Sequence, residues 1–279
     1  MVKWMKKNLE LYLIKKCVMR VDYGQVMERD IEEVVLKLRA NLDKEGFQLL
    51  EGKVSDNQRG VNEESCDSEI REFLFKKKIG HVRIKLSRYY LIIEQLVKDD
   101  YCGFTYFIEK MQTIITSLFH INEICEIKQI EYQTVDTLVF KKLANINNYF
   151  VIDFFNYNKV ASLVTEDGLG LEVGKSFYNL KLDDATELNL VTYLEEGEIT
   201  EKSGKETTAY QVIIDSKLVY DTIEERNAKI VINILKKLHD KQYDLYKKLL
   251  TADFQNKLEN GDYDRDDIVG GVYCGKSEE

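Results

Sequence analysis

Hydrophobic and polar residues alternate at the start of the chain and then change to a helical spacing. Between Leu9 and Tyr23 apolar residues occupy mainly every second position, a pattern typical of a strand with one buried face. From residue 25 to residue 46 they recur at helical spacing, which predicts an amphipathic helix that ends in a left-handed conformation at Gly46. Residues 47–54 again have the character of a strand.

A polar, acidic stretch at residues 55–68 is predicted to be an exposed loop, and strand patterns follow it. Residues 69–78 and 81–88 are predicted to form two strands around Gly80. The apolar set that begins at Tyr90 predicts a more deeply buried strand.

A second helix and a further strand complete the pattern of the first half. Residues 104–120 carry apolar side chains at helical spacing, and residues 125–132 form a strand pattern that residues 135–140 extend past a bulge. The order strand, helix, strands, helix, strand predicts an α+β fold, a ferredoxin-like split βαββαβ arrangement with an extra strand or hairpin. One antiparallel sheet would then bury the apolar faces of both helices.

The second half is richer in strand patterns and ends in a long helix. Strand-like segments at 149–157, 158–166, 170–182, 187–196 and 210–220 are separated by Asn, Asp and Gly. From residue 224 onward a long amphipathic helix follows, and Thr251 is predicted to cap a shorter one. The apolar stripe of the long helix could exceed what one sheet covers and form a docking face. This predicted interaction helix presents Ile230, Ile234, Leu238, Leu245 and Leu249.

These patterns divide the chain into three parts. We predict a ferredoxin-like α+β half at residues 1–145, and an antiparallel β half with the long C-terminal helix at residues 146–260. Residues 261–279 have little periodicity and are predicted to form an acidic flexible tail.

The charge balance changes which partners are expected. The 279 residues include 40 basic and 49 acidic ones, which gives a net charge of −9. This charge argues against general electrostatic binding of nucleic acid. No stretch reaches the roughly 18 apolar residues of a membrane-spanning helix, and the first residues do not resemble a signal peptide. We therefore expect a cytoplasmic protein with no membrane partner.

Candidate metal and cofactor motifs are incomplete. The five cysteines lie tens of residues apart, and the three histidines are scattered. The run 168–176 lacks the first glycine of a phosphate-binding loop, and the acidic run at 262–267 lacks the glycine and glutamate of a calcium loop. Adjacent positions on a helix point about 100° apart, so His239 and Asp240 are not expected to form a hydrogen-bonded dyad. We expect no cofactor and no catalytic residue.

Two aspartates inside apolar strands are weak candidates for metal ligands. Asp153 and Asp215 lie in the segments VIDFF and VIIDS, and converging carboxylates on strands can hold magnesium against phosphate. Strand alternation places Asp153 on the solvent face instead.

One dense basic stripe provides the alternative to a purely structural interpretation. Its period of two places Arg83 and Lys85 on the same face of a strand, with aromatic residues within reach for base stacking. A solvated outer strand protected by lysines explains the same residues. The stripe consists of Lys76, Lys77, Lys78, Arg83, Lys85 and Arg88.

Two segments resemble a sporadically distributed, uncharacterised bacterial protein family of similar length. The first is YCGFTYFIEKMQTIITSLFHINEICEIKQIEYQTVDTLVF at 101–140, and the second runs from YQVIIDSKLVY at Tyr210 to Phe254, with Leu238-His239, Tyr246 and Leu250-Thr251. The resemblance implies kinship of fold over most of residues 10–258 and no catalytic residues. The sporadic distribution hints at mobile or defence-associated, antiviral genes.

Two function classes remain, with a third behind them. The first is a non-catalytic protein-interaction or assembly protein, because no convergent set of ionisable groups emerges from the sequence. The alternative is an RNA- or DNA-binding protein that uses the stripe from Lys76 to Arg88 on a ferredoxin-like sheet. A metal-dependent nuclease built on Asp153 and Asp215 is third.

Overall fold

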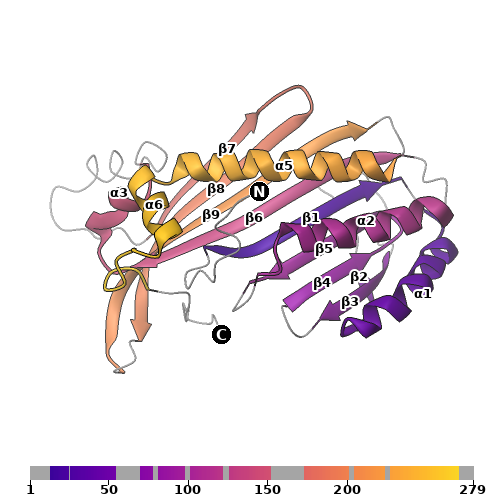
Figure 1. Cartoon of the computed structure of the whole chain (residues 1–279), viewed down its shortest axis with the longest axis horizontal. Coiled ribbons are helices and arrows are strands. Elements are labelled where there is room, and N and C mark those ends of the chain that lie inside the picture. The colour runs from indigo at the N-terminus through magenta and orange to yellow at the C-terminus, as the bar shows by residue number, and fades with distance from the viewer. Residues whose placement is uncertain are drawn as a thin grey trace.

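The centre of the protein is an antiparallel sheet. A computed structural model describes residues 13–24, 26–54, 70–77, 81–97, 101–121, 126–151, 173–200, 204–223 and 227–269. These residues form nine strands in the order β2-β3-β4-β5-β1-β6-β9-β8-β7 (Figure 1). The strands are β1 (Ile14–Tyr23), β2 (Phe47–Val54), β3 (Ile70–Lys77), β4 (Val82–Leu86), β5 (Tyr90–Leu96), β6 (Ile127–Phe140), β7 (Val173–Lys181), β8 (Thr186–Thr200) and β9 (Glu206–Ile223).

Three long helices cover one face of this sheet (Figure 1). Alternation within each strand sends one set of side chains, such as Met19, Phe75 and Ile130, into a continuous core beneath them. The described helices are α1 (Glu28–Lys44), α2 (Phe104–Ile121), α3 (Ile146–Tyr149), α5 (Ala228–Leu249) and α6 (Ala252–Asn260), with a short 3-10 turn η3 (Leu143–Asn145) before α3. The fold is therefore α+β, with a large antiparallel sheet.

The other set of strand side chains points away from α1, α2 and α5. We call this surface the open face and define it by the outward-pointing side chains of β3, β4, β5, β1, β6 and β9. No described helix packs on it (Figure 1). Examples are Arg20 on β1, Ile92 on β5 and Glu131 on β6, which are all only half-buried.

Local signals place the helix ends where the sequence predicts them. The apolar face of α1 is buried, and Gly46 follows the helix at φ 85°, a conformation that glycine adopts without strain. Thr251 caps α6, because its side-chain oxygen accepts a hydrogen bond from the Phe254 backbone N–H at 3.2 Å. These two predictions are confirmed.

The bulge predicted between Tyr132 and Val135 is wrong. β6 runs without interruption, since Gln133 pairs with Val18 of β1 on one side and with Lys217 of β9 on the other. The register shifts between β1 and β6 lie near the ends of β1 instead, between Ile14 and Lys16 and between Asp22 and Tyr23. β6 takes up an extra residue at Lys128 instead, since Asp22 pairs with Gln129 and Tyr23 with Ile127.

The sheet is continuous across the predicted boundary at residue 145. β6, in the first predicted half, pairs along nearly its whole length with β9, in the second. Of the strand patterns predicted at 149–157 and 158–166, nearly all lie outside the described residues. Of the predicted tail at 261–279, residues 261–269 are described, and Asp267 and Ile268 are buried.

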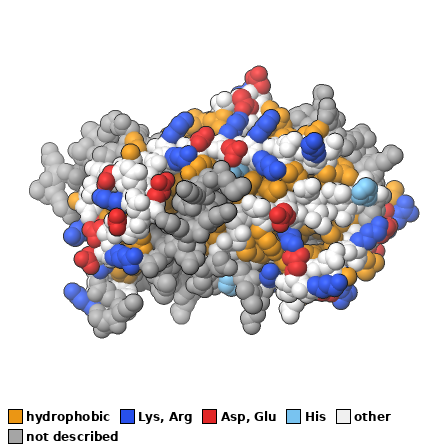
Figure 2. Space-filling model, in the orientation of Figure 1, with side chains coloured by type: hydrophobic (Ala, Val, Ile, Leu, Met, Phe, Trp, Pro, Cys, Tyr) orange, Lys and Arg blue, Asp and Glu red, His pale blue; other side chains and the backbone are white. Residues whose placement is uncertain are grey.

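None of the described helices is long and apolar enough to cross a lipid bilayer. On the helix-covered side, Figure 2 shows basic and acidic side chains interspersed around hydrophobic ones.

Candidate functional site

The basic stripe predicted from the sequence is split between the two faces of the sheet. Lys76 and Arg83 are paired neighbours on β3 and β4, and Lys85 shares their side, so all three belong to the open face. The Lys77 ammonium lies on the other side, 5.6 Å from the centre of the Phe47 ring.

Two other members of the stripe do not join that group. The Arg88 guanidinium lies 5.2 Å from the centre of the Tyr89 ring, in the turn between β4 and β5. Lys78 lies outside the described residues. The stripe is therefore reduced to three adjacent cations on the open face.

Glu94 neutralises part of this cationic group. Its carboxylate oxygen lies 3.3 Å from the Arg83 guanidinium and 3.3 Å from the Lys85 ammonium, and its side chain is only 11% exposed. Arg83, Lys85 and the Glu94 carboxylate between them together carry a net charge of +1. The electrostatic attraction for phosphate is correspondingly smaller than the sequence suggests.

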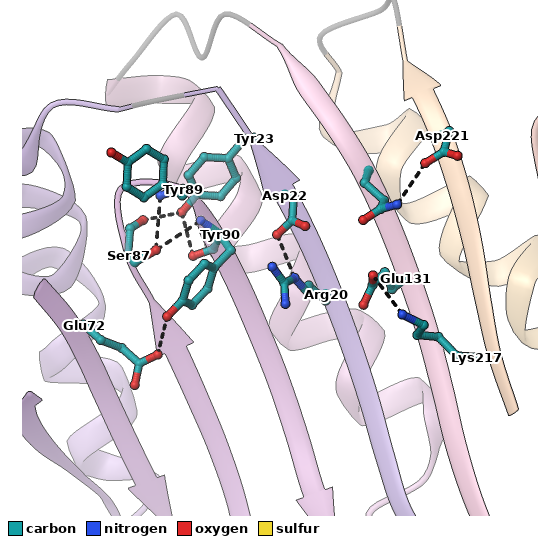
Figure 3. A network of polar contacts seen from close by, with 11 residues as sticks. Arg20, Asp22, Tyr23, Glu72, Ser87, Tyr89, Tyr90, Glu131, Lys217 and Asp221 are labelled. Carbon is teal, nitrogen blue, oxygen red and sulfur yellow. Dashed lines mark hydrogen bonds and ion pairs between the residues drawn. The ribbon is translucent and has the colours of Figure 1, made fainter. Parts of the chain in front are cut away.

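Polar pairs continue across the open face onto the neighbouring strands (Figure 3). Within β1, Arg20 pairs with Asp22 at 2.8 Å, and the Arg20 guanidinium lies 5.3 Å from the Tyr90 ring centre. The Tyr90 hydroxyl donates a hydrogen bond to Glu72 of β3 at 2.7 Å. Burial and this carboxylate raise the pKa of Tyr90. These contacts link the strands β1, β5 and β3 on the open face.

Further pairs join β6 to β9. The Lys217 ammonium lies 3.6 Å from the Glu131 carboxylate, and the Gln129 amide donates to Asp221 at 2.9 Å (Figure 3). Both pairs link the neighbouring strands β6 and β9. Their charged side chains, positive and negative, each have a polar partner on the surface. Such a surface is ordered before any partner arrives.

A tyrosine from β1 fixes the turn between β4 and β5 at the edge of this network. The Tyr23 hydroxyl donates to the backbone carbonyls of Ser87 at 2.7 Å and of Tyr90 at 3.0 Å. The Ser87 side chain accepts from the backbone N–H groups of Tyr89 and Tyr90 (Figure 3). These bonds satisfy backbone groups of the turn, and they hold the Tyr90 ring in place on the open face.

The two aspartates predicted as metal ligands do not form a described site. Asp215 is on the open face, where it accepts a hydrogen bond from the Gln133 amide at 2.7 Å. Asp153 lies outside the described residues. Throughout the described ranges no three His, Cys, Asp or Glu side chains gather closely enough to hold a metal ion.

The apolar stripe of the predicted interaction helix is not a docking face. Leu238 and Leu249 are each 1% exposed and Ile234 is 6% exposed, because α5 lies directly on β6 and β9. Ile230 and Leu245 pack against the same core. The prediction is wrong because the second half of the sheet is wide enough to use the whole stripe.

A buried polar cluster under α5 is a feature that sequence reasoning missed. The Gln242 amide donates to the hydroxyls of Thr134, at 2.8 Å, and of Ser216. Thr134 in turn donates to the Asp136 carboxyl at 3.0 Å. Burial raises the pKa of Asp136 to about 7. The available signal was polar residues in the inward phase of β6, at Thr134 and Asp136.

A thiol and two phenols lie beside this cluster. Cys17 lies 3.8 Å from the Tyr132 hydroxyl, and burial raises the pKa of the Cys17 thiol to about 12. Burial also raises the pKa of Tyr132 and of Tyr101. A thiol that is protonated at neutral pH is a poor nucleophile, so this grouping does not provide an activated cysteine.

His239 is part of the hydrophobic packing near the same place. Its ring stacks on Phe104 of α2 with ring centres 3.7 Å apart, and burial lowers its pKa. Its Nδ1 lies 3.3 Å from the Asp240 carboxylate, so the expectation that these adjacent residues form no hydrogen bond is wrong. Asp240 is largely exposed, and the pair sits at the surface edge of the α2–α5 contact.

Comparisons with known proteins add no family or fold relationship. No protein-family model, no curated protein and no solved structure matches this chain.

Proposed function

We propose that the chain is a non-catalytic assembly protein that binds a second copy of itself through the open face of its sheet. The observation that carries the proposal is a surface spanning six strands on which half-buried apolar side chains alternate with partnered charges. Val18, Val135 and Ile213 are such apolar residues on the central strands β1, β6 and β9. Covering them would remove apolar area from water at about 25 cal/mol per Å².

The charges of the open face favour a second copy as the partner. The whole chain carries a net charge of −9, so two copies repel each other over most approaches. On the open face the described basic and acidic side chains balance, which allows an isologous contact in which each sign meets the other. The basic residues are Lys16, Arg20, Lys76, Arg83, Lys85 and Lys217, and the acidic residues are Asp22, Glu72, Glu94, Glu131, Asp215 and Asp221.

A charge introduced at the centre of the open face should separate the copies. We expect light scattering to give a dimeric mass for the wild type and a monomeric mass for Val18→Glu and Ile213→Lys, because each buries an unpaired charge at the contact. Leu36→Glu is the matched control, since Leu36 is 67% exposed on α1, away from this surface. A wild type that stays monomeric at every concentration contradicts the proposal.

RNA or DNA binding is the second candidate. It is favoured by one observation, the adjacent cations Lys76, Arg83 and Lys85 on a sheet surface that also carries the Tyr90 ring. The position of β1 between β5 and β6 supports a ferredoxin-like first half enlarged by a hairpin, a fold that places such a surface against bases. Kinship with the bacterial family rests on the two segments that resemble it.

A salt titration separates nucleic-acid binding from self-assembly. Binding of labelled single-stranded RNA at low salt should weaken steeply as salt is added, and further in the double variant Arg83→Ala/Lys85→Ala. If the wild type binds no RNA or DNA at low salt, this candidate is excluded while the assembly proposal is untouched.

A further inference from the structure

A polar cavity of about 420 Å³ lies where α3, α6 and the segment 261–269 that follows α6 meet. This volume is within the range of small-molecule sites, about 300–1,000 Å³. Its polar lining includes Asn147 and Asn148 on α3, Asp253 and Lys257 on α6, and Tyr263 and Asp264 after α6. α3 and α6 lie at the end of the molecule opposite α1 (Figure 1), and none of the residues that line the cavity belongs to the open face.

Hydrogen bonds hold the first two walls of the cavity together. The Thr251 hydroxyl donates to the Asn148 carbonyl at 2.7 Å, and the Thr251 backbone N–H donates to the Tyr149 carbonyl at 3.0 Å. The buried rings of Tyr149 and Phe254 pack with centres 4.8 Å apart. The start of α6 is thereby fixed against α3.

The third wall is anchored by a buried carboxylate. Asp267 is 1% exposed and accepts hydrogen bonds from the backbone N–H groups of Lys141 and Lys142, at 3.1 and 3.0 Å. It also accepts from the Asn145 amide at 2.7 Å and from the Tyr149 hydroxyl. These hydrogen bonds and ring contacts fix all three walls, so binding would order few groups.

The lining groups suit a ligand that is uncharged and that both donates and accepts hydrogen bonds. The amides of Asn147 and Asn148 can do both, while Asp264 only accepts. Lys257 pairs with Asp253 at 2.6 Å, so the ammonium is already neutralised. Two aspartates and one lysine give 1 − 2 = −1 in the lining, which disfavours an anion.

We propose that this cavity binds a neutral polyhydroxylated ligand of the size of a sugar. Each hydroxyl of such a ligand donates one hydrogen bond and accepts others, which matches amides and carboxylates placed side by side. The Tyr263 ring supplies an apolar surface for the C–H groups of the ligand. The site is independent of the self-assembly proposed for the open face.

Saturation-transfer NMR with glucose, galactose and N-acetylglucosamine as separate probes tests the site. We expect a signal from at least one sugar, and we expect the double variant Asn147→Ala/Lys257→Met to weaken its binding about tenfold or more. Both residues are exposed, so the variant should fold. Lys236→Met, an exposed change on α5 outside the cavity, should leave binding unchanged.

Three results would overturn the proposal. They are the lack of a signal from all three sugars, a signal that survives in the double variant, and displacement of the bound sugar by inorganic phosphate. Because the readout is ligand binding, none of these results bears on whether two copies associate.

Discussion

At the scale of single residues, the buried carboxyls show how the surroundings decide the role of a charge. Asp267 is buried but accepts four hydrogen bonds, two of them from backbone N–H groups, and it anchors the described segment that follows α6. Asp136 is buried with one hydroxyl donor, at Thr134, and burial raises its pKa. The first side chain stabilises the fold through its four hydrogen bonds, whereas the second stabilises it best when protonated.

Asp136 should make the protein less stable as pH rises. Its pKa is about 7 in the folded protein, against an ordinary value of 3.8. Below pH 4 both states hold the proton; between pH 4 and 7 the unfolded state loses it first, so the free energy of unfolding falls by on the order of 4 kcal/mol. Asp136→Asn should lack this fall, measured by urea unfolding at pH 5 and pH 8.

The test compares how steeply the free energy of unfolding falls with pH in the wild type and in Asp136→Asn. All other titrating groups are present in both proteins. Groups close to Asp136 are the Cys17 thiol, the phenols of Tyr101, Tyr132 and Tyr246, and Asp215 on the opposite face. Equal loss of stability from pH 5 to pH 8 in wild type and Asp136→Asn would show that Asp136 ionises normally in the folded protein.

Asp267 should be among the residues near the end of the chain that matter most for stability. Asp267→Asn replaces a carboxylate that accepts four hydrogen bonds, so we expect the free energy of unfolding to fall by about 2–4 kcal/mol. The exposed neighbour Asp266 is the control, and Asp266→Asn should change stability by less than about 0.5 kcal/mol. Equal effects of the two variants in urea unfolding would contradict the anchoring role.

At the scale of elements, α5 is a core helix. Leu238→Ala should lower the free energy of unfolding by about 2–5 kcal/mol, because it leaves a cavity under a side chain that is 1% exposed. Leu36→Ala on α1 is the control and should be nearly neutral, since Leu36 is 67% exposed. If Leu238→Ala weakened association but left denaturant unfolding unchanged, the helix would be a docking face after all.

Most elements could be predicted from local sequence, whereas the pairing between them could not. α1 and α6 follow from spacing and capping, since Gly46 and Thr251 act within a few residues of their helix ends. The amphipathic pattern of α5 predicts a helix, but how wide a sheet it covers depends on β6 and β9 meeting across many residues of sequence.

The candidate site was harder to predict, for the same reason. The period of two correctly placed Arg83 and Lys85 on one face, but their neutralisation by Glu94 depends on the register of β4 with β5. The cluster of Asp136 with Gln242 joins residues more than a hundred positions apart. The net charge can be counted from the sequence, but the charge of a surface patch depends on which strands pair and in which register.

At the scale of the whole molecule, one face of the sheet is occupied by helices and the other carries balanced charges. The net charge of −9 makes non-specific contacts between copies unfavourable, while the partnered pairs of the open face leave one surface where two copies can meet. The proposed assembly would cover the half-buried apolar side chains of this face, such as Val18 and Ile213.

Zero-length cross-linking of a mixture of ¹⁵N-labelled and unlabelled protein tests this claim most directly. Cross-linked peptides that combine one labelled and one unlabelled chain can only come from contacts between copies. We predict that these peptides join lysines of the open face, such as Lys85 and Lys217, to its carboxylates, such as Glu131 and Asp221. Mixed peptides that come only from the lysines of α1 and α5, or no mixed peptides at all, would contradict the account.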